Sequence, residues 1–346
     1  MSSRIEIDLD AFRANVRTLS EIAAPARTML AVKADGYGHG MVPIARAALE
    51  SGADSLAVLD VTAALALREA GIDAQLFAWL HGADTDFRNA IDAGVDLGVS
   101  SLLELERIIS AGSSRVAAVH LKIDTGLHRN GASPEDWPKL VRAALAAEGR
   151  VRITGLWSHL ADASPEADEA AHAEFQAAVA VAAGLGVPTE GADRPILHLA
   201  ASSAGIRMPA ARFDLVRFGI AAYGSSPFDD TTARELGMRA PMTVFAAVVD
   251  SRDGIAVLDL GSADGIPPSG SGAQVWLEGR RAAVTAVGID TIEIAANAAV
   301  GVEAIVFGPG DQGEPTAEEW AAWAGTIGDE ILARASTRIP RFYLNE

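Results

Sequence analysis

Short apolar runs alternate with amphipathic patterns through the first two thirds of the chain. Eight of these runs fit strands, at residues 29–32, 55–59, 75–80, 97–100, 116–123, 151–157, 195–200 and 215–223. The segments between them repeat apolar residues with the helical period, and several close on a glycine, as in the turn at 51–54. Repeated helix–glycine–strand units are typical of parallel β/α folds. The pattern predicts a closed (β/α)8 TIM-type barrel over residues 8–238, with a doubly wound sheet as the alternative.

The pattern changes after Pro241. Six short runs rich in β-branched residues follow, at 243–249, 255–260, 274–277, 281–287, 291–295 and 302–307, with turn signals such as Asp253-Gly254 between them. They predict a mostly antiparallel β-domain over residues 239–346, with residues 1–7 as candidates to join it. The segment 229–232 is the expected linker.

Two helices carry recognisable start signals. Asp10 precedes a run with Phe12, Val16 and Leu19 on one face, which predicts a helix capped by Asp10. Near the other end of the chain, residues 316–319 form a capping box that predicts a single helix over 320–335.

Composition narrows the function classes. The 346 residues are 49% hydrophobic and carry a net charge of −18, which disfavours nucleic acid and anionic membranes as partners. No apolar run approaches the roughly 20 residues of a membrane helix, and the first residues show no secretory signal pattern, so the cytoplasm is the default expectation. The chain has no cysteine, so neither a disulfide framework nor a thiolate metal site is expected.

The first candidate for chemistry is Lys33. The apolar run 29–32 ends at this lysine, and the turn 35–40 follows at once with three glycines, Tyr37 and His39. A lysine at the C-terminal end of a barrel strand loses solvation, its pKa falls, and its amine can form a Schiff base with a carbonyl cofactor. Glycines allow backbone N–H groups to approach a phosphate. A surface lysine after a strand is the alternative.

The segment 29–40 as a whole resembles the pyridoxal 5'-phosphate attachment segment of the alanine racemases, usually A-V-V-K-A-N-A-Y-G-H-G. The resemblance implies a pyridoxal phosphate enzyme with Lys33 as the attachment residue and acid–base catalyst. It also implies a homodimer that acts on a small amino acid, with each site completed at the subunit interface.

Further motifs extend the resemblance over nearly the whole chain. Residues 122–129, K-I-D-T-G-L-H-R, resemble the family motif K-[VI]-D-T-G-M-x-R. The resemblance implies that Arg129 contacts the cofactor and the substrate. It also implies that Lys122, which is often carbamylated in the family, holds this arginine. Residues 155–159 resemble G-L-x-[TS]-H, in which His159 would stack on the cofactor ring. Residues 197–202 resemble H-x-A-N-S, in which Ser202 would bind phosphate and His198 would support a neighbouring arginine, although the asparagine is Ala201 here.

That arginine is Arg217. Residues 217–224 resemble R-x-G-I-x-x-Y-G, in which Arg217 faces the pyridine nitrogen of the cofactor while Gly219 and Ile220 offer backbone N–H groups to its phosphate. An arginine does not give up its proton, so the ring stays a weak electron sink, which fits racemisation better than decarboxylation. Residues 338–343 resemble R-V-P-R-x-Y and imply that Tyr343, with Tyr37, reaches the phosphate.

The resemblance fails where a second acid–base group is expected. The family supplies a tyrosine from the β-domain of a second subunit, in a stretch like V-S-Y-G-A-T-Y, but here residues 249–254 run directly into 255–257 and the stretch is absent. The chain has three tyrosines, and all match other positions. The family's motif at the site entrance, G-Y-A-D-G, reads G-S-A-D-G here, with Ser262 in place of the tyrosine. The motif C-M-D-Q, which helps to seat the substrate in the family, reads G-I-D-T here and contains Ile289 and Asp290.

Three functions remain open on this reading. The leading one is a pyridoxal phosphate-dependent isomerase of the alanine racemase type that interconverts L- and D-alanine with altered or reduced two-base racemisation. The second is a cofactor-binding homologue that has lost racemisation and serves a binding or regulatory role. The third is a one-base reaction at the α-carbon, such as that of a lyase or aldolase.

Overall fold

The computed structural model describes residues 3–268 and 272–346, which form two compact units. The first, called the barrel unit here, comprises residues 19–33 and 52–219. The second, called the β-unit, comprises residues 1–18, 34–51 and 220–346. The predicted boundary between residues 238 and 239 stays a prediction. Among the described residues, no helix is both long and apolar enough to cross a membrane.

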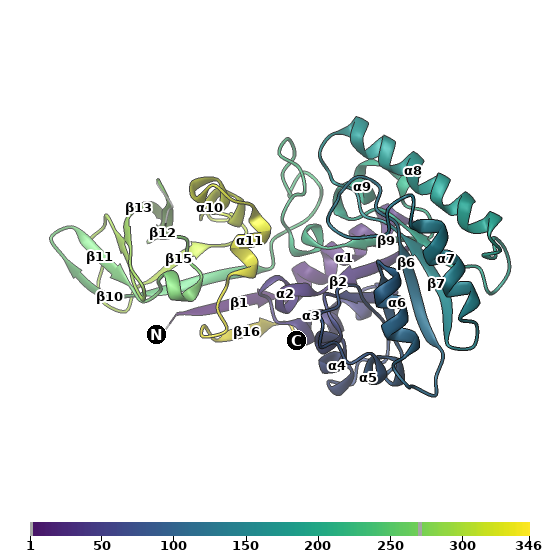
Figure 1. Cartoon of the computed structure of the whole chain (residues 1–346). Helices are drawn as coiled ribbons and strands as arrows, with labels where there is room; N and C mark the ends of the chain where they lie inside the picture. The colour runs from purple at the N-terminus through teal and green to yellow at the C-terminus, as the bar shows by residue number, and fades with distance from the viewer. Residues whose placement is uncertain (1–2, 269–271) are drawn as a thin grey trace. The chain divides into compact units, whose positions relative to one another are not determined.

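Eight parallel strands form the sheet of the barrel unit, in the order β8-β7-β6-β5-β4-β3-β2-β9 (Figure 1). The strands are β2 (Arg27–Ala31), β3 (Ser55–Val58), β4 (Gln75–Ala78), β5 (Val95–Val99), β6 (Ala117–Lys122), β7 (Val151–Trp157), β8 (Ile196–His198) and β9 (Leu215–Phe218). Backbone hydrogen bonds from Asp214 to Leu197 and from Arg217 to Ala200, both 3.1 Å, join the two ends of the sheet. The barrel is therefore nearly closed. The predicted TIM-type barrel is confirmed, and the doubly wound alternative is wrong.

Helices follow most strands of the barrel unit. They are α4 (Val61–Glu69), α5 (Phe87–Asp92), α6 (Leu102–Ile109), α7 (Trp137–Ala146), α8 (Pro165–Gly184) and α9 (Ser202–Arg207). Four of them begin after an Asp or Ser whose side chain accepts a hydrogen bond from the backbone N–H three residues on. These caps fix where the four helices begin after the carboxyl ends of their strands.

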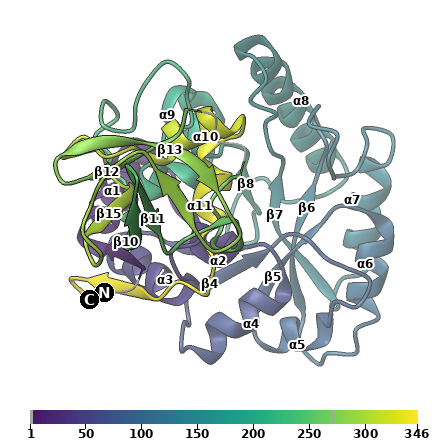
Figure 2. The same ribbon diagram turned by 90° about the vertical axis from the view of Figure 1, so that its left-hand side faces the viewer.

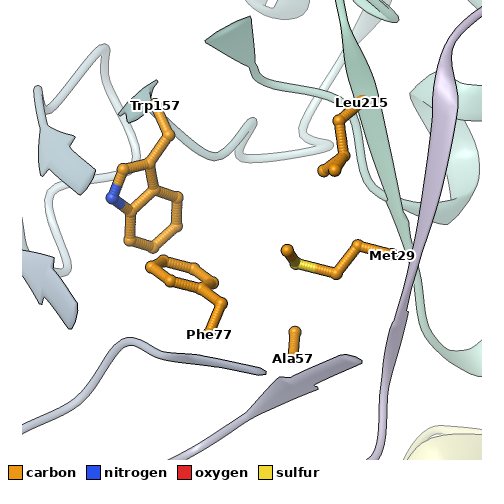
Figure 3. Packing of buried hydrophobic residues seen from close by; sticks show 5 residues of the cluster. All are labelled: Met29, Ala57, Phe77, Trp157 and Leu215. Carbon is orange, nitrogen blue, oxygen red and sulfur yellow. The ribbon is translucent and has the colours of Figure 1, made fainter. Parts of the chain in front are cut away.

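Large side chains fill the barrel interior. Met29, Ala57, Phe77, Trp157 and Leu215 form a buried cluster contributed by five different strands (Figure 3). Inward-facing residues alternate with outward-facing ones along a strand, so each strand contributes one or two residues to this core. The core therefore fixes the strand ends that carry the candidate site.

The β-unit contains a second sheet of eight strands, in the order β11-β14-β13-β12-β15-β10-β1-β16 (Figure 2). Its strands are β1 (Arg4–Asp8), β10 (Met242–Arg252), β11 (Ile255–Leu258), β12 (Gln274–Leu277), β13 (Arg280–Val287), β14 (Ile292–Ile294), β15 (Glu303–Phe307) and β16 (Arg341–Leu344). All pairs are antiparallel except β1 with β16. The predicted antiparallel β-domain is confirmed, and the sequence patterns missed β1 and β16.

The helix starts need two corrections. Helix α1 (Leu9–Ala23) is capped by Asp8, whose Oδ1 accepts from the N–H groups of Asp10 and Ala11 at 3.1 Å, so Asp10 lies inside the helix. The predicted helix 320–335 is two helices, α10 (Ala317–Ala324) and α11 (Gly328–Ala333). Gly325 breaks the run because it adopts a left-handed conformation with φ 69°.

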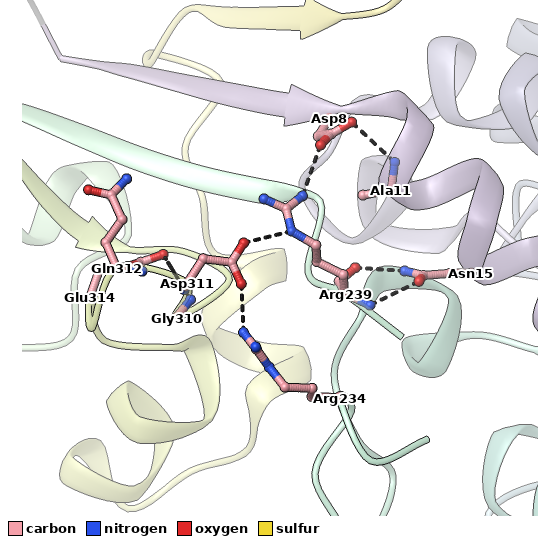
Figure 4. Close-up of polar contacts among 9 residues, drawn as sticks. All are labelled: Asp8, Ala11, Asn15, Arg234, Arg239, Gly310, Asp311, Gln312 and Glu314. Carbon is pink, nitrogen blue, oxygen red and sulfur yellow. Dashed lines mark hydrogen bonds and ion pairs between the residues drawn. The ribbon is translucent and has the colours of Figure 1, made fainter. Parts of the chain in front are cut away.

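One arginine joins three segments of the β-unit that are distant in sequence. Arg239 pairs with Asp8 and with Asp311, both at 2.8 Å, and its backbone exchanges two hydrogen bonds with Asn15 (Figure 4). The loop at 310–312 is held by Glu314, whose buried carboxylate accepts three of its backbone N–H groups. Charged hydrogen bonds to a buried carboxylate are among the stronger contributions to local order.

Candidate active site

Lys33 stands at the carboxyl end of a barrel strand. Strand β2 ends at Ala31, and the backbone then enters a left-handed turn, labelled α2 (Lys33–Tyr37). Residues 34–37 have φ of 52°, 53°, 61° and 49°. Left-handed backbone costs roughly 1–2 kcal/mol for each residue with a Cβ, and such strain is concentrated at functional sites. The turn is held by backbone hydrogen bonds to Ala34 and Asp35.

In the β-unit, the turn is followed by helix α3 (Met41–Glu50), and Gly40, just before this helix, lies close to Tyr343. A Cβ on Gly40 would lie 2.0 Å from the hydroxyl of Tyr343 on β16, so only glycine leaves room for that hydroxyl. The ring of Tyr37 lies 4.6 Å from that of Tyr223, and burial raises the pKa of Tyr37. Tyr37 and Tyr343 are thus placed in one unit, while their predicted contact with phosphate stays a prediction.

Arg217 is a buried cation of the barrel unit with four polar contacts. Its guanidinium donates to the Ser158 carbonyl at 2.8 Å, the Leu199 carbonyl at 2.9 Å and His198 Nδ1 at 2.9 Å. A further contact reaches His159 Nδ1 at 3.2 Å. Burial lowers the pKa of Arg217 to about 9, so the group is a cation at neutral pH. A buried cation with this many acceptors has one fixed orientation.

His159 follows strand β7 and lies among cations. Burial, followed by Arg217, Arg129, Lys122 and Lys33, holds the pKa of His159 well below its usual range. The imidazole is therefore neutral, with Nδ1 facing Arg217. Lys33 is among the cations that act on this ring, so Lys33 and His159 lie near each other within the barrel unit.

Lys122 ends strand β6 and is almost fully buried, with 2% of its surface exposed. Its Nζ donates to the Asn130 side chain and lies 4.7 Å from the Trp157 ring centre. Burial, with Arg217 and Arg129 nearby, lowers the pKa of Lys122 to about 7. Arg129 itself is exposed on a loop whose turn is formed by hydrogen bonds to the Asp124 carboxylate.

Ser202 and Gly219 form a small polar corner. Ser202 begins helix α9, and its buried Oγ accepts from the Gly219 N–H at 3.1 Å. A hydroxyl and a backbone N–H are groups that can donate to a phosphate oxygen, and here the N–H donates to the hydroxyl oxygen. Ile220, which starts a 3-10 turn (Ile220–Tyr223), belongs to the β-unit.

Two of the three predicted substrate residues, Ile289 and Asp290, lie in the β-unit, and the third, Arg129, lies in the barrel unit. Ser262 and Ala263 donate backbone hydrogen bonds to Gly288 and Ile289, both at 2.9 Å, which brings the entrance motif against the 288–291 turn. The side chain of Ile289 is 72% exposed, and Asp290 accepts from Arg338 at 3.2 Å. Strand β10 turns directly into β11 at 253–254, where the resemblance has its missing stretch.

Sequence reasoning missed three residues that support this site: Asn130, His120 and Asp96. His120 is fully buried between His198 and Asp96, with contacts of 2.9 and 3.2 Å. A signal for it was available, because His120 and Lys122 sit two apart in an otherwise apolar strand and so face the same side. Two polar residues on the inward face of a barrel strand indicate a polar site inside the barrel.

Both family models for this fold match the chain. The model of the alanine racemase N-terminal domain matches residues 7–227, and that of the C-terminal domain matches residues 245–343. The chain belongs to the alanine racemase family. The resemblance found in the sequence motifs is thereby confirmed at the level of the family.

Similar proteins cover the full length. The chain is 41% identical to the alanine racemase of Thermobifida fusca and 40% to that of Streptomyces coelicolor, covering 99% and 97% of those proteins. The crystal structure of alanine racemase from Streptomyces lavendulae has a TM-score of 0.95 at 37% identity, covering 100% of this chain and 98% of that one.

The Thermobifida fusca alignment runs over 382 positions although this chain has 346 residues, so at least 36 positions lie opposite gaps in this chain.

Proposed function

We propose that this chain binds pyridoxal phosphate through Lys33 and moves the α-proton of alanine or another small amino acid. When bound, pyridoxal phosphate supplies a carbonyl that condenses with an amine and a ring that withdraws electrons from the α-carbon. The residues present fit this group: an amine at Lys33, a hydroxyl and an N–H at Ser202 and Gly219, and a cation at Arg217. The roles of Tyr37, Tyr343, Ile220, Ile289 and Asp290 rest on the family resemblance alone.

The fixed guanidinium of Arg217 carries this proposal. A guanidinium only donates hydrogen bonds, so it would leave the pyridine nitrogen without a proton. Electron withdrawal from the α-carbon is then weak, which favours short-lived proton removal and return over decarboxylation or transamination. Neutral His159, held at Arg217 through Nδ1, presents a ring that can pack against the cofactor.

Lys33 is the proposed acid–base group for one face of the α-carbon, the face that carries the proton of the D-enantiomer. The tyrosine that serves the other face in the family has no counterpart in this sequence. Ser262 is a poor substitute, because a hydroxyl is a much weaker acid than a phenol. Losing one general acid–base group costs about 10²–10⁴ in rate. We therefore expect exchange of the D-alanine α-proton to outrun interconversion of the enantiomers.

Proton NMR in deuterium oxide tests this expectation. Each alanine enantiomer is incubated with the protein, and loss of the α-proton signal is compared with the appearance of the opposite enantiomer on a chiral column. Equal, rapid loss from both enantiomers with full racemisation would show that a second base exists. Cofactor bound without any exchange would favour the non-catalytic homologue, and cleavage of a β-hydroxy amino acid would favour the one-base lyase or aldolase.

Cofactor attachment has its own test. Borohydride reduction followed by peptide mapping is expected to place a pyridoxyl group on Lys33. The surface residue Lys139, which pairs with Asp136 at 2.7 Å, serves as an internal control that should stay unlabelled. A label on another lysine, or no bound cofactor after reconstitution, rules out the assignment.

Carbamylation of Lys122 belongs to the same proposal. Carbamate formation needs a neutral amine, which attacks CO2 and releases a proton, and a pKa near 7 supplies that amine at physiological pH. The resulting anion would be compensated by Arg129 and Arg217. A carbamate resonance in the ¹³C spectrum with labelled bicarbonate, absent in Lys122→Met, is the expected result. The homodimer and the cytoplasmic location are also part of the proposal.

A further inference from the structure

A continuous row of hydrogen bonds crosses the interior of the barrel unit. It starts at the Arg217 guanidinium, which donates to His198 Nδ1 at 2.9 Å. His198 Nε2 lies 2.9 Å from His120 Nδ1, and His120 Nε2 lies 3.2 Å from Asp96 Oδ2. The Gln75 amide donates to the same carboxylate oxygen at 2.6 Å. Both histidines are fully buried, with no exposed surface.

Only one arrangement of protons satisfies every link. A guanidinium cannot accept a hydrogen bond, so His198 Nδ1 carries no proton and its Nε2 does. His198 Nε2–H then donates to His120 Nδ1, which leaves the second proton of the pair on His120 Nε2. That N–H donates to the Asp96 carboxylate, which can only accept. The row therefore runs in one direction, from a cation to an anion through two neutral rings.

The packing around His120 keeps its ring in this row. The ring stacks on Phe77 at 4.6 Å with an interplanar angle of 23°. On the neighbouring strand β7, a Cβ at position 155 would lie 2.5 Å from His120 Cγ and Nδ1, so glycine is needed there. His198 is likewise parallel to Trp157, with a 2° angle between the rings. Neither imidazole has room to turn.

We infer that His120 and Asp96 are positioning residues for Arg217, because together they fix the tautomer of His198 that accepts from the guanidinium. Without the Asp96 carboxylate, the buried N–H at His120 Nε2 has no acceptor. If the proton of His120 moved to Nδ1 instead, the new N–H would face the N–H at His198 Nε2. His198 would then have to carry its proton on Nδ1, where it faces the guanidinium. Two donors would face each other, and Arg217 would lose one of its fixed contacts.

Nitrogen NMR of ¹⁵N-histidine-labelled protein tests the inference directly. The chain has seven histidines, and the spectrum of a neutral ring tells Nδ1–H from Nε2–H. We expect both His120 and His198 to carry the proton on Nε2 in the wild-type protein, with or without cofactor. The proton on Nδ1 of either ring, or a doubly protonated ring at neutral pH, would overturn the inference without any variant.

Two substitutions at one position separate positioning from folding. Asp96→Asn keeps an acceptor for His120 and should keep both tautomers. Asp96→Leu removes it and should change the tautomer of His198. The matched control is Thr154→Val, which removes a 3.3 Å hydrogen bond from strand β7 to the Val119 carbonyl on strand β6, outside the row. An unchanged His198 tautomer in Asp96→Leu contradicts the inference.

The kinetic readout rests on the proposed function, and the NMR readout does not. For exchange of the D-alanine α-proton, Asp96→Leu is expected to lower kcat about tenfold, with KM changed less than about twofold. Asp96→Asn should recover most of the loss, and Thr154→Val should resemble the wild type. If the wild-type protein does not exchange the α-proton of D-alanine, the proposed function fails. The tautomers of His120 and His198 measured by NMR still test the inference in that case. Equal kcat in Asp96→Leu and wild type would refute it.

Discussion

Replacing Lys122 by methionine is expected to stabilise the barrel unit at neutral pH and to remove a pH dependence. The ammonium is 2% exposed, and Arg217 and Arg129 repel it. Its contacts with Asn130 and with the Trp157 ring do not offset this environment, because burial and the two arginines lower the pKa of Lys122 to about 7. Methionine has a similar length and carries no charge.

The size and sign of the effect follow from the two pKa values. An unfolded lysine titrates near 10.4, so the difference of roughly 3.4 pKa units corresponds to about 4–5 kcal/mol. Below pH 7 both states are protonated, and the folded protein carries the whole penalty. Between pH 7 and about 10 the unfolded state binds one more proton, so the stability of the wild type rises by about 1.4 kcal/mol per pH unit. The advantage of the methionine variant therefore falls across this window.

Urea denaturation monitored by tryptophan fluorescence measures this difference at pH 7, 8, 9 and 10. The buffer must be free of bicarbonate, because a carbamate would trap the neutral amine. Lys139→Met is the matched control, since it removes an exposed lysine of the same length. A difference between Lys122→Met and wild type that stays constant from pH 7 to 10 would show that Lys122 remains charged in the folded protein.

Three further outcomes are expected. By urea titration, Gly40→Ala should lower the free energy of unfolding by about 1–3 kcal/mol more than Gly71→Ala does. Both glycines adopt positive φ, but only at Gly40 would a Cβ meet another group, the Tyr343 hydroxyl at 2.0 Å. Equal costs would contradict this. Thr316→Ala should lower the free energy of unfolding by about 1 kcal/mol, because the Thr316 hydroxyl accepts a hydrogen bond from the Glu319 N–H. Thr316→Ser keeps a hydroxyl and should lower it much less. A similar loss in both variants would show that the methyl group, not the hydroxyl, is responsible. Sedimentation at micromolar concentration should give a homodimer, and a monomer would count against the proposed assembly.

The barrel and the β-domain could both be predicted from the chain. Each apolar run of the first 238 residues overlaps one of the eight strands, because a parallel strand buried on both faces reads as continuous apolar sequence. The six runs after Pro241 each overlap a strand as well. The position of Lys33 directly behind a strand could also be predicted, since the strand and the glycine turn adjoin in sequence.

Elements that depend on distant partners could not be predicted. Strands β1 and β16 are five and four residues long. They are strands only because β1 pairs with β10 on one side and with β16 on the other. The predicted helix 320–335 is broken at Gly325, where helical periodicity alone gives no warning. The N-cap of α1 is Asp8 rather than Asp10, a shift within the usual uncertainty of helix ends.

The sequence alone determined which chemical groups are present, and the tertiary structure decided their state. Lys122, His159 and Arg217 are recognisable in motifs, but burial lowers the pKa of all three, and neighbouring cations lower those of Lys122 and His159 further. The row from Arg217 to Asp96 joins strands β9, β8, β6 and β5, which lie far apart in the chain. Barrel closure brings their inward-facing residues within hydrogen-bond distance, and no local pattern encodes which polar side chains will meet there.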